Sequence, residues 1–260
     1  MPQDQSEHLY QDRARALSFG GVAALYDRAR PSYPSELIDA LMTASPRRVL
    51  DVGCGTGKAA RLLLERGCDV IGVEPDPSMA AIARSHGITV EEATFESWEA
   101  NGRVFDLIVS GQAWHWVDPE RGAAKAGSLL RPGGHLGVFW NRGRPDELAA
   151  NVLGEVYTRF APALAETNVA LNMPPEPRDR IAEFQKSGLF TEVAARSFRW
   201  EAVYDRAGWL GLIATHSDHL RLPDPQRRAL LDALGEAVDA LGGTLTYHYS
   251  TVLVLAKRGV

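Results

Sequence analysis

Hydrophobic and polar positions along the chain change repeatedly from strand-like to helix-like spacing. Short apolar segments bounded by glycine, proline or charged residues predict strands, and the spacing from Lys58 to Leu64 predicts an amphipathic helix. The segment 105–110 is mainly apolar, which is typical of a parallel sheet covered by helices on both faces. In the first half of the chain, strands are predicted at 49–52, 68–73, 88–91, 105–110 and 136–141.

The second half of the chain predicts further helices, two long strands and a lid. A polar, proline-rich stretch at 172–177 separates two of the helices. Residues 252–255 are continuously apolar, so the last strand is expected to lie within the sheet. The predicted helices cover 146–164, 179–187, 205–214 and 225–241, and the predicted strands cover 191–204 and 244–256.

A glycine-rich turn follows the first predicted strand. After Asp51, glycine recurs at alternate positions (Gly53, Gly55 and Gly57), and the next helix begins near Lys58. Glycine allows a tight turn and lets a ligand approach the backbone without interference from Cβ atoms. The turn therefore predicts a binding site, although an ordinary strand-to-helix turn without a ligand is the simplest alternative.

Two other nucleotide-binding motifs fit this turn poorly. A dinucleotide turn has the spacing G-x-G-x-x-G, with its third glycine one position later than Gly57. A phosphate-binding P-loop requires glycine where Val52 stands, and serine or threonine where Ala59 stands. These departures exclude the P-loop and disfavour an NAD-linked oxidoreductase.

An acidic residue ends the second predicted strand. Glu74 lies about twenty positions beyond the turn, where a carboxylate can accept hydrogen bonds from ribose hydroxyls. Asp76 and Pro77 then form a helix-start signal, and Met79 could cover an adenine. The turn, the helix, the strand and Glu74 together predict one βαβ unit with a nucleoside pocket.

This pattern resembles motif I of the class I S-adenosylmethionine-dependent methyltransferases. The segment 94–96 after the third strand, the aromatic turn after the fourth and the Arg131–Gly134 turn follow in the order of that family. The resemblance implies an α/β, Rossmann-like fold with a mostly parallel seven-stranded sheet, helices on both faces and an antiparallel last strand. The cofactor residues that it implies are Asp51, Gly53, Cys54, Gly55, Thr56, Gly57, Glu74, Pro75, Met79, Thr94, Phe95, Glu96, Gly111, Gln112 and Ala113.

The resemblance to the family covers the core at about 45–140. The segment 19–34 extends it, and the chain is similar there to a small-molecule subgroup that includes trans-aconitate methyltransferase. The resemblance implies S-adenosylmethionine as cofactor and S-adenosylhomocysteine as product. At 260 residues the chain can form a single domain (1–260). Its expected parts are a helical lead-in (1–44), a cofactor-binding core (45–141), and the remaining sheet with an acceptor-pocket lid (142–260).

The lead-in contains two tyrosines and an arginine that could close over the cofactor. Tyr26 and Arg30 are four residues apart and share a face if the segment is helical before Pro31. Arg30 could bind a carboxylate of the cofactor or of the substrate, and Tyr33 is a candidate for the substrate pocket. A surface ion pair with packed tyrosines is the alternative.

His115 is the leading catalytic candidate because it follows the fourth strand, where such sheets bind ligands. A neutral imidazole there could take a proton from an acceptor hydroxyl or orient it. A carboxylate acceptor would need no base, since it is already ionised at pH 7. An alcohol, phenol or amine still carries its proton at that pH, so a base would have to remove it. The alternative is that His115 only packs between Trp114 and Trp116.

Four further residues are candidates for acceptor binding, namely Trp116, Trp140, Arg142 and His216. His216 and His219 are three residues apart, but no third and fourth metal ligands can be named. We therefore expect no metal.

The composition of the chain limits the kinds of molecule that it is expected to bind. The net charge is −5 and there is no dense basic run, which disfavours nucleic acid and anionic membranes. No apolar stretch approaches a membrane span, residues 1–5 lack signal-peptide features, and the two cysteines suggest no disulfide framework. These features predict a cytoplasmic protein, and we expect a monomer or homodimer. The small-molecule acceptor is what the resemblance implies.

The sequence thus predicts a methyltransferase that acts on a small-molecule acceptor, at a carboxylate or hydroxyl oxygen, by direct displacement. Methylation of nitrogen, carbon, sulfur or a macromolecule is the alternative among enzymes. From another class, the chain could be a regulatory protein that binds S-adenosylmethionine without catalysis.

Overall fold

The computed structural model describes residues 9–12, 15, 17–165, 168, 170–173 and 178–259. The expectations for residues 1–5 and for most of the proline-rich stretch at 172–177 lie outside these residues. Within the described residues, no helix is both long enough and apolar enough to cross a membrane.

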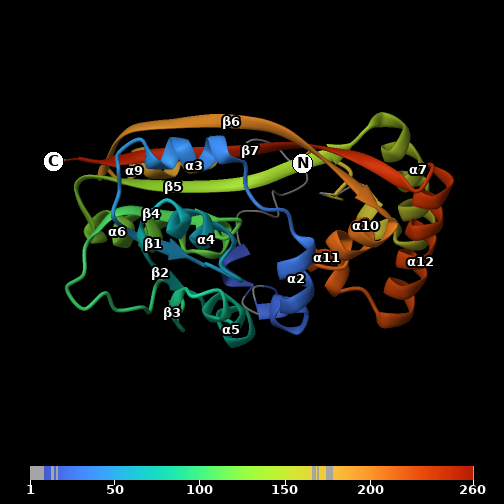
Figure 1. Cartoon of the computed structure of the whole chain (residues 1–260), viewed down its shortest axis with the longest axis horizontal. Coiled ribbons are helices and arrows are strands. Elements are labelled where there is room, and N and C mark those ends of the chain that lie inside the picture. Colours follow the sequence, from blue (N-terminus) through green and yellow to red (C-terminus); the bar gives the residue numbers. More distant parts are fainter. Residues whose placement is uncertain are drawn as a thin grey trace.

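Seven strands form one twisted sheet in the order β3-β2-β1-β4-β5-β7-β6 (Figure 1). The first five strands pair in parallel, and β7 pairs antiparallel with both β5 and β6. The predicted Rossmann-like sheet with an antiparallel last strand is therefore confirmed. The strands are β1 (Arg48–Val52), β2 (Asp69–Val73), β3 (Thr89–Glu91), β4 (Phe105–Gly111), β5 (Leu130–Pro145), β6 (Phe190–Asp205) and β7 (Thr244–Arg258).

Strand β5 is much longer than the predicted strand at 136–141. It begins at Leu130, and the register with β4 shifts around Arg131–Gly134, so the expected turn lies inside the strand. At its other end β5 continues to Pro145, because β7 stays paired with it through Pro145 and Tyr247. The apolar pattern stops at Asn141, although Arg142, Gly143 and Pro145 beyond it are still buried.

Helices cover both faces of the parallel half of the sheet (Figure 1). One face packs against side chains such as Leu37 and Leu63, and the other against Ala126 and Phe184. The two faces receive alternate strand residues, because successive side chains of a strand point in opposite directions. The helices over the two faces are α3 (Ser35–Met42), α4 (Lys58–Glu65), α5 (Pro77–Ser85), α6 (Pro119–Leu129) and α9 (Arg178–Lys186).

A second layer of helices forms the lid around the far ends of β5, β6 and β7 (Figure 1). It has its own apolar core, in which Trp209, Leu234 and Tyr247 are buried. The lid helices are α7 (Glu147–Phe160), α8 (Pro162–Ala165), α10 (Arg206–Ile213), α11 (Ser217–Leu220) and α12 (Asp224–Ala240).

The lead-in lies between the core and the lid. Its described elements are η1 (Leu9–Gln11), η2 (Leu17–Val22) and α2 (Ala23–Ala29). Helix α2 contacts both α5 of the core and α10 of the lid (Figure 1). Because α2 runs to Ala29, the predicted helix before Pro31 is confirmed.

Gly57 offers a test of the turn into α4. It is the N-cap residue, has φ +85°, and a Cβ atom there would lie 2.1 Å from Ile88 Cδ1. Gly57→Ala should lower the free energy of unfolding by about 1–2 kcal/mol through its backbone conformation and by about 1–3 kcal/mol more through the clash. Thermal and urea unfolding would measure both.

Gly67→Ala is the matched control, because Gly67 has φ +82° and a Cβ atom there would meet nothing within 4 Å. It should show only the backbone cost. Equal destabilisation by the two substitutions would contradict the close packing of Gly57 against Ile88.

Candidate cofactor and acceptor site

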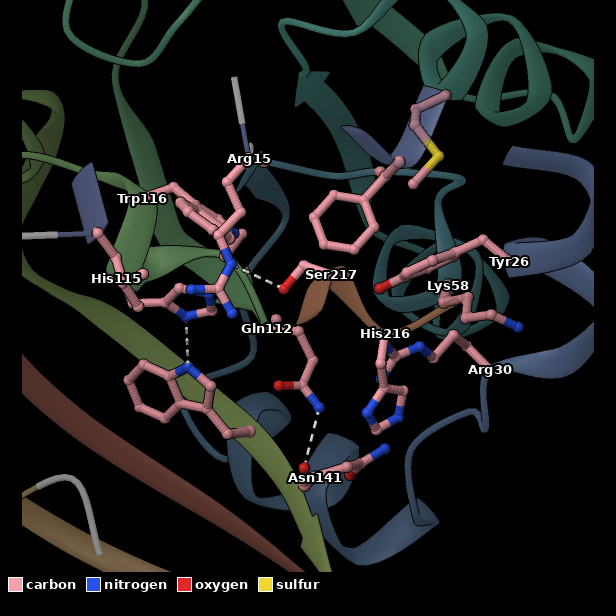
Figure 2. A pocket seen from close by; sticks show the side chains of 18 of the residues that line it. Arg15, Tyr26, Arg30, Lys58, Gln112, His115, Trp116, Asn141, His216 and Ser217 are labelled. Carbon is pink, nitrogen blue, oxygen red and sulfur yellow. Dashed lines mark hydrogen bonds between the residues drawn. The ribbon is translucent and has the colours of Figure 1, made fainter. Parts of the chain in front are cut away.

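A cavity of about 1480 Å³ opens at the carboxyl ends of β1, β2, β4 and β5, between the core, the lead-in and the lid. Such an edge of a parallel sheet is where α/β folds bind ligands. Figure 2 shows side chains from all three parts of the fold pointing into one space. Of the sequence-predicted cofactor residues, all but Gly57 line the cavity.

The glycine turn holds its backbone against the cavity. Gly53 has φ +65°, and a Cβ atom on it would lie 2.5 Å from Ala113 Cβ. Gly55 has φ +55°, and its N–H donates to Glu74 Oε2 at 2.9 Å. Gly57 is a structural residue at the start of α4, which explains why it does not reach the cavity.

Glu74 is fixed by two backbone donors at the end of β2. Besides the bond from Gly55, its Oε1 accepts from the N–H of Asp76 at 2.9 Å. Asp76 in turn caps α5 by accepting from the N–H groups of Ser78 and Met79. The predicted helix start is therefore confirmed, and Glu74 is held at the cavity wall in one orientation.

Asp51 and Glu74 form a pair of buried carboxyl groups on the cavity wall. Burial raises the pKa of Asp51 to about 8, with a further contribution from the charge of Glu74. Burial likewise raises the pKa of Glu74 to about 7. The Ala60 amide favours ionised Asp51, yet neither Asp51 oxygen has a hydrogen-bond partner among the described residues.

These observations test whether the site suits the cofactor. A buried carboxylate without partners needs a cation or hydrogen-bond donors, since an unpaired buried charge is costly. S-adenosylmethionine carries an ammonium group, a sulfonium and two ribose hydroxyls. The residues Asp51, Gly55 and Glu74 therefore fit this group.

The residues after β3 form the side of the cavity where an adenine is expected. Phe95 is buried and packs against Trp114, with ring centroids 6.0 Å apart. Glu96 accepts a hydrogen bond from the N–H of Asp118 at 2.9 Å. Thr94, Pro75 and Met79 complete this wall.

The residues after β4 shape the centre of the cavity. Gly111 allows a close approach, because a Cβ atom there would lie 2.6 Å from both the Tyr33 hydroxyl and the Phe139 ring. Gln112 has φ +60°, and its side-chain amide donates to the Asn141 carbonyl at 3.0 Å (Figure 2). The residue that follows β4 is thereby bonded to the middle of β5 at the cavity.

Arg30 and Tyr26 lie together at the junction of lead-in and lid. The Arg30 guanidinium carbon lies 5.3 Å from the centre of the Tyr26 ring. Arg30 also donates to the Thr215 hydroxyl at 2.8 Å and to the Thr215 carbonyl at 2.9 Å. Both side chains line the cavity, so the predicted shared face is confirmed and is turned towards the ligand space.

His115 lies in the short helix η3 (Trp114–Trp116) and lines the cavity. Its Nδ1 accepts a hydrogen bond from Trp140 Nε1 at 3.2 Å, and its ring lies 4.7 Å from the Trp116 ring (Figure 2). Burial lowers the pKa of His115 to about 4, with further lowering by Arg180 and Arg15. The imidazole is therefore neutral at physiological pH.

The predicted acceptor residues Tyr33, Trp116, Trp140, Arg142 and His216 all line the cavity. By contrast, Trp114 and Trp209 are fully buried in the apolar cores. Sequence reasoning missed several polar lining residues from the lead-in, α9 and β7, because their positions depend on contacts between distant segments. They include Arg15, Arg180, Tyr247 and Tyr249.

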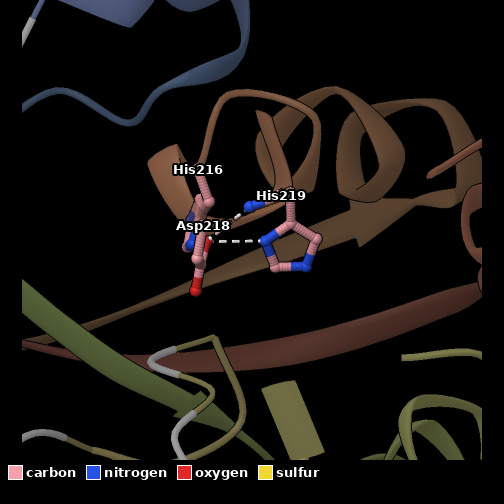
Figure 3. Close-up of side chains that lie close together, drawn as sticks. All are labelled: His216, Asp218 and His219. Atoms are coloured by element: carbon pink, nitrogen blue, oxygen red, sulfur yellow. Dashed lines mark hydrogen bonds and ion pairs between the residues drawn. The ribbon is translucent and has the colours of Figure 1, made fainter. Parts of the chain in front are cut away.

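His216, Asp218 and His219 cluster at the lid side of the cavity (Figure 3). Their ligand atoms lie within 4.8 Å of one another, as in many metal sites. Both nitrogens of His219 are already engaged, however, by Asp218 Oδ1 and by the Tyr157 hydroxyl at 2.8 Å each. Burial alone would raise the pKa of Asp218, but its bond to His219 holds that pKa below its usual range.

Comparison with known proteins agrees with this geometry. Residues 26–151 match the family model described as a methyltransferase domain. An uncharacterized methyltransferase from Mycobacterium tuberculosis is 35% identical over 252 residues, which cover 94% of this chain and 97% of the relative. A malonyl-[acyl-carrier protein] O-methyltransferase from Enterobacter lignolyticus is 36% identical, over 88% of this chain and 94% of the relative.

Two further comparisons bear on the subgroup and the fold. A trans-aconitate 2-methyltransferase from Acidovorax ebreus is 34% identical over 117 residues, which cover 43% of this chain and 44% of the relative. A methyltransferase structure from Anaeromyxobacter dehalogenans superposes with a TM-score of 0.63, at 24% identity, over 88% of this chain and 97% of that chain. The relatives are methyltransferases, and the glycine turn and the buried carboxyl pair suit the cofactor of such enzymes. The chain therefore belongs to the S-adenosylmethionine-dependent methyltransferase family.

Proposed function

We propose that this methyltransferase transfers a methyl group to an oxygen atom of a small molecule bound in the same cavity. The observation that carries the proposal is that the cavity extends beyond the glycine turn to a wall lined by His115, Trp116, Trp140 and Arg142. The names of two relatives support the proposal. One is a malonyl-[acyl-carrier protein] O-methyltransferase, which supports transfer to oxygen, and the other is a trans-aconitate 2-methyltransferase, which supports a small acceptor.

The size and position of the cavity support a small acceptor. At about 1480 Å³ it exceeds the usual range of a site for one small ligand, so it can hold a cofactor and a second molecule. Residues of the lead-in, such as Arg15 and Tyr26, and of the lid, such as Ser217, line it opposite the sheet. This arrangement favours a molecule that fits inside the protein over a macromolecular surface.

Each group on the cofactor side has a role that its chemistry suits. Glu74 would accept hydrogen bonds from the ribose hydroxyls, and Asp51 would pair with the ammonium group. Arg30 would bind the carboxylate of the methionine part, beside the ring of Tyr26. The backbone of Gly53 and Gly55 leaves room for the cofactor to lie against the turn.

When bound, S-adenosylmethionine supplies a methyl group activated by a positively charged sulfur. The protein must hold the acceptor oxygen in line with that methyl group and keep water away. Positioning of this kind can lower a barrier by roughly 7–11 kcal/mol in the best model systems. Trp116, Trp140 and Tyr33 provide rigid walls for such positioning, since aromatic rings have few rotatable bonds.

Direct detection of the product tests the proposed function. The purified protein would be incubated with S-adenosylmethionine carrying an isotopically labelled methyl group and with a pool of small metabolites. We expect a small product with one labelled methyl group on oxygen, identified by mass spectrometry and NMR. Binding of the cofactor without transfer to any small molecule would instead indicate a regulatory protein or a macromolecular substrate.

Glu74→Gln tests the cofactor side. Glutamine keeps the shape but removes the charge, and its NH2 group, which cannot accept, replaces one of the two oxygens that bind Gly55 and Asp76. Loss of charged hydrogen bonds costs about 1.5–3 kcal/mol, so the Kd for S-adenosylhomocysteine should rise about 10- to 100-fold. Calorimetric titration measures this change.

Glu92→Gln is the control, since Glu92 is an exposed carboxylate paired with Arg84 outside the cavity. Its Kd should match that of the unsubstituted protein. An unchanged Kd in Glu74→Gln would remove Glu74 from the cofactor site.

The raised pKa values of Asp51 and Glu74 predict that cofactor binding depends on pH. Both groups are partly protonated in the free protein near pH 7, and a cation and hydroxyl donors favour their ionised forms. Binding should therefore release protons, and affinity for S-adenosylhomocysteine should rise as pH increases from 6 to 7.5. Titrations in buffers of different ionisation enthalpy count the protons, and Asp51→Asn should reduce that number.

A constant or falling affinity over this pH range would contradict ionisation of the two carboxyl groups on binding. Proton release that is unchanged in Asp51→Asn would assign the whole effect to Glu74.

A further inference from the structure

The hydrogen bond from Trp140 determines which nitrogen of His115 carries a proton. The indole Nε1–H can only donate, so His115 Nδ1 must offer its lone pair at 3.2 Å. A neutral imidazole with an acceptor at Nδ1 has its proton on Nε2. The contact with Trp140 therefore selects the Nε2–H tautomer.

The Nε2–H group of His115 is available to a ligand. The ring lines the cavity, and Nε2 has no hydrogen-bond partner among the described residues. Nε2 is also not one of the fully buried polar atoms of these residues. In this tautomer Nε2 can donate a hydrogen bond but cannot take up a proton. His115 thus presents a donor, where a general base would present a lone pair.

Arg15 lines the same cavity as this donor. Its charge, together with that of Arg180, acts on His115 and lowers the pKa of that histidine. Figure 2 shows the Arg15 Nε–H bonded to the Ser217 hydroxyl, at 2.9 Å. The nearby acidic groups of the cavity are already paired, Asp179 with Arg180 and Asp218 with His219. Among the described residues, no carboxylate is bonded to the Arg15 guanidinium, so its charge can act on a ligand.

We infer that Arg15 and the Nε2–H of His115 form an anion-binding subsite, that Trp140 positions His115 for it, and that the methylated group is a carboxylate. This inference rests on the proposed function and specifies its acceptor. A carboxylate is ionised at neutral pH and needs no base. Both groups would bind one carboxylate oxygen and leave the other towards the methyl donor.

The transfer step then requires no proton movement. A lone pair of the free carboxylate oxygen forms the bond to the methyl carbon, and the bond from that carbon to sulfur breaks. The electron pair remains on sulfur, so the products are a neutral methyl ester and S-adenosylhomocysteine. Loss of the carboxylate charge also weakens the ester's contacts with Arg15 and His115, which favours its release.

The other titratable groups of the cavity fit a hydroxyl acceptor less well. An alcohol or phenol would need a base, and His216 is the other histidine of the described residues that line the cavity. Burial, with the charge of Arg30, holds the pKa of His216 well below its usual value, so it too is a weak base. Asp51 and Glu74 lie on the cofactor side of the cavity.

The first experiment compares acceptors. Small mono- and dicarboxylic acids, their matched alcohols and their amides would be offered with isotopically labelled S-adenosylmethionine. We expect methyl esters of acids and no methylation of the matched alcohols or amides. Methyl ethers as the main products would overturn the inference but leave oxygen methylation intact, whereas no small product at all would contradict the proposed function as well.

The second experiment separates a donor from a base at His115. Glutamine can place an N–H near the position of Nε2, so His115→Gln should keep kcat/KM within about tenfold of the original value. His115→Ala, which removes the donor, should lose roughly 10- to 100-fold. Equal and larger losses in both variants, with S-adenosylhomocysteine binding unchanged, would indicate a base and overturn the inference.

Trp140→Phe tests the positioning role without relying on activity. In the original protein, ¹⁵N NMR of labelled histidine should show His115 protonated at Nε2, and the substitution should shift the ring towards a mixture of tautomers. KM for the carboxylic acid should rise more than kcat falls. A proton on Nδ1 in the original protein would overturn the assignment.

Arg15→Gln completes the test of the anion site. KM for the acid should rise roughly 10- to 100-fold, with the Kd for S-adenosylhomocysteine unchanged. Arg66→Gln is the control, because Arg66 pairs with Asp39 on the surface, away from the cavity. Equal KM values for these two variants would remove Arg15 from the subsite.

Discussion

The carboxylate of Glu74 is the interaction on which the cofactor half of the cavity depends. It accepts the N–H of Gly55 from the turn after β1 and the N–H of Asp76 at the start of α5. One side chain thus fixes the ends of two adjacent strands relative to each other. The lead-in is fitted to the same point, because a Cβ atom on Gly20 would lie 2.2 Å from Asp76 Oδ2.

The lead-in extends this network from the core to the lid. Asp27 on α2 pairs with Arg61 of α4 and with His86 after α5. On the other side Arg30 is bonded to Thr215, and Arg15 to Ser217. The segment that the sequence suggested as a cover for the cofactor is therefore also the connection between the two halves of the cavity.

The predictable part of the protein is the part whose signals are local. The turn from Asp51 to Gly57, the acid at Glu74 and the cap at Asp76 are predicted from neighbouring residues. All of them line the cavity except Gly57, which starts α4. The end of β5 was missed because its strand conformation depends on pairing with β7, over 100 positions later, and its residues from Arg142 to Pro145 have no strand pattern.

The same limit explains the incomplete reading of the acceptor side. Arg15 has no motif around it, and its position follows from contact with Ser217, 202 residues away. His115 was predicted to face the ligand space from its place after β4, and it lines the cavity. The nitrogen that it offers depends on Trp140, which lies on another strand, and sequence order alone does not give that contact.

The length of β5, β6 and β7 has a mechanical consequence. These strands run without interruption from the parallel core into the lid, so the two halves share one hydrogen-bonded ribbon. A lid built this way cannot swing about a flexible hinge as a separate body. The described part of the lead-in, by contrast, is joined to the lid by side-chain bonds such as those of Arg15 and Arg30 and has no strand paired with the sheet.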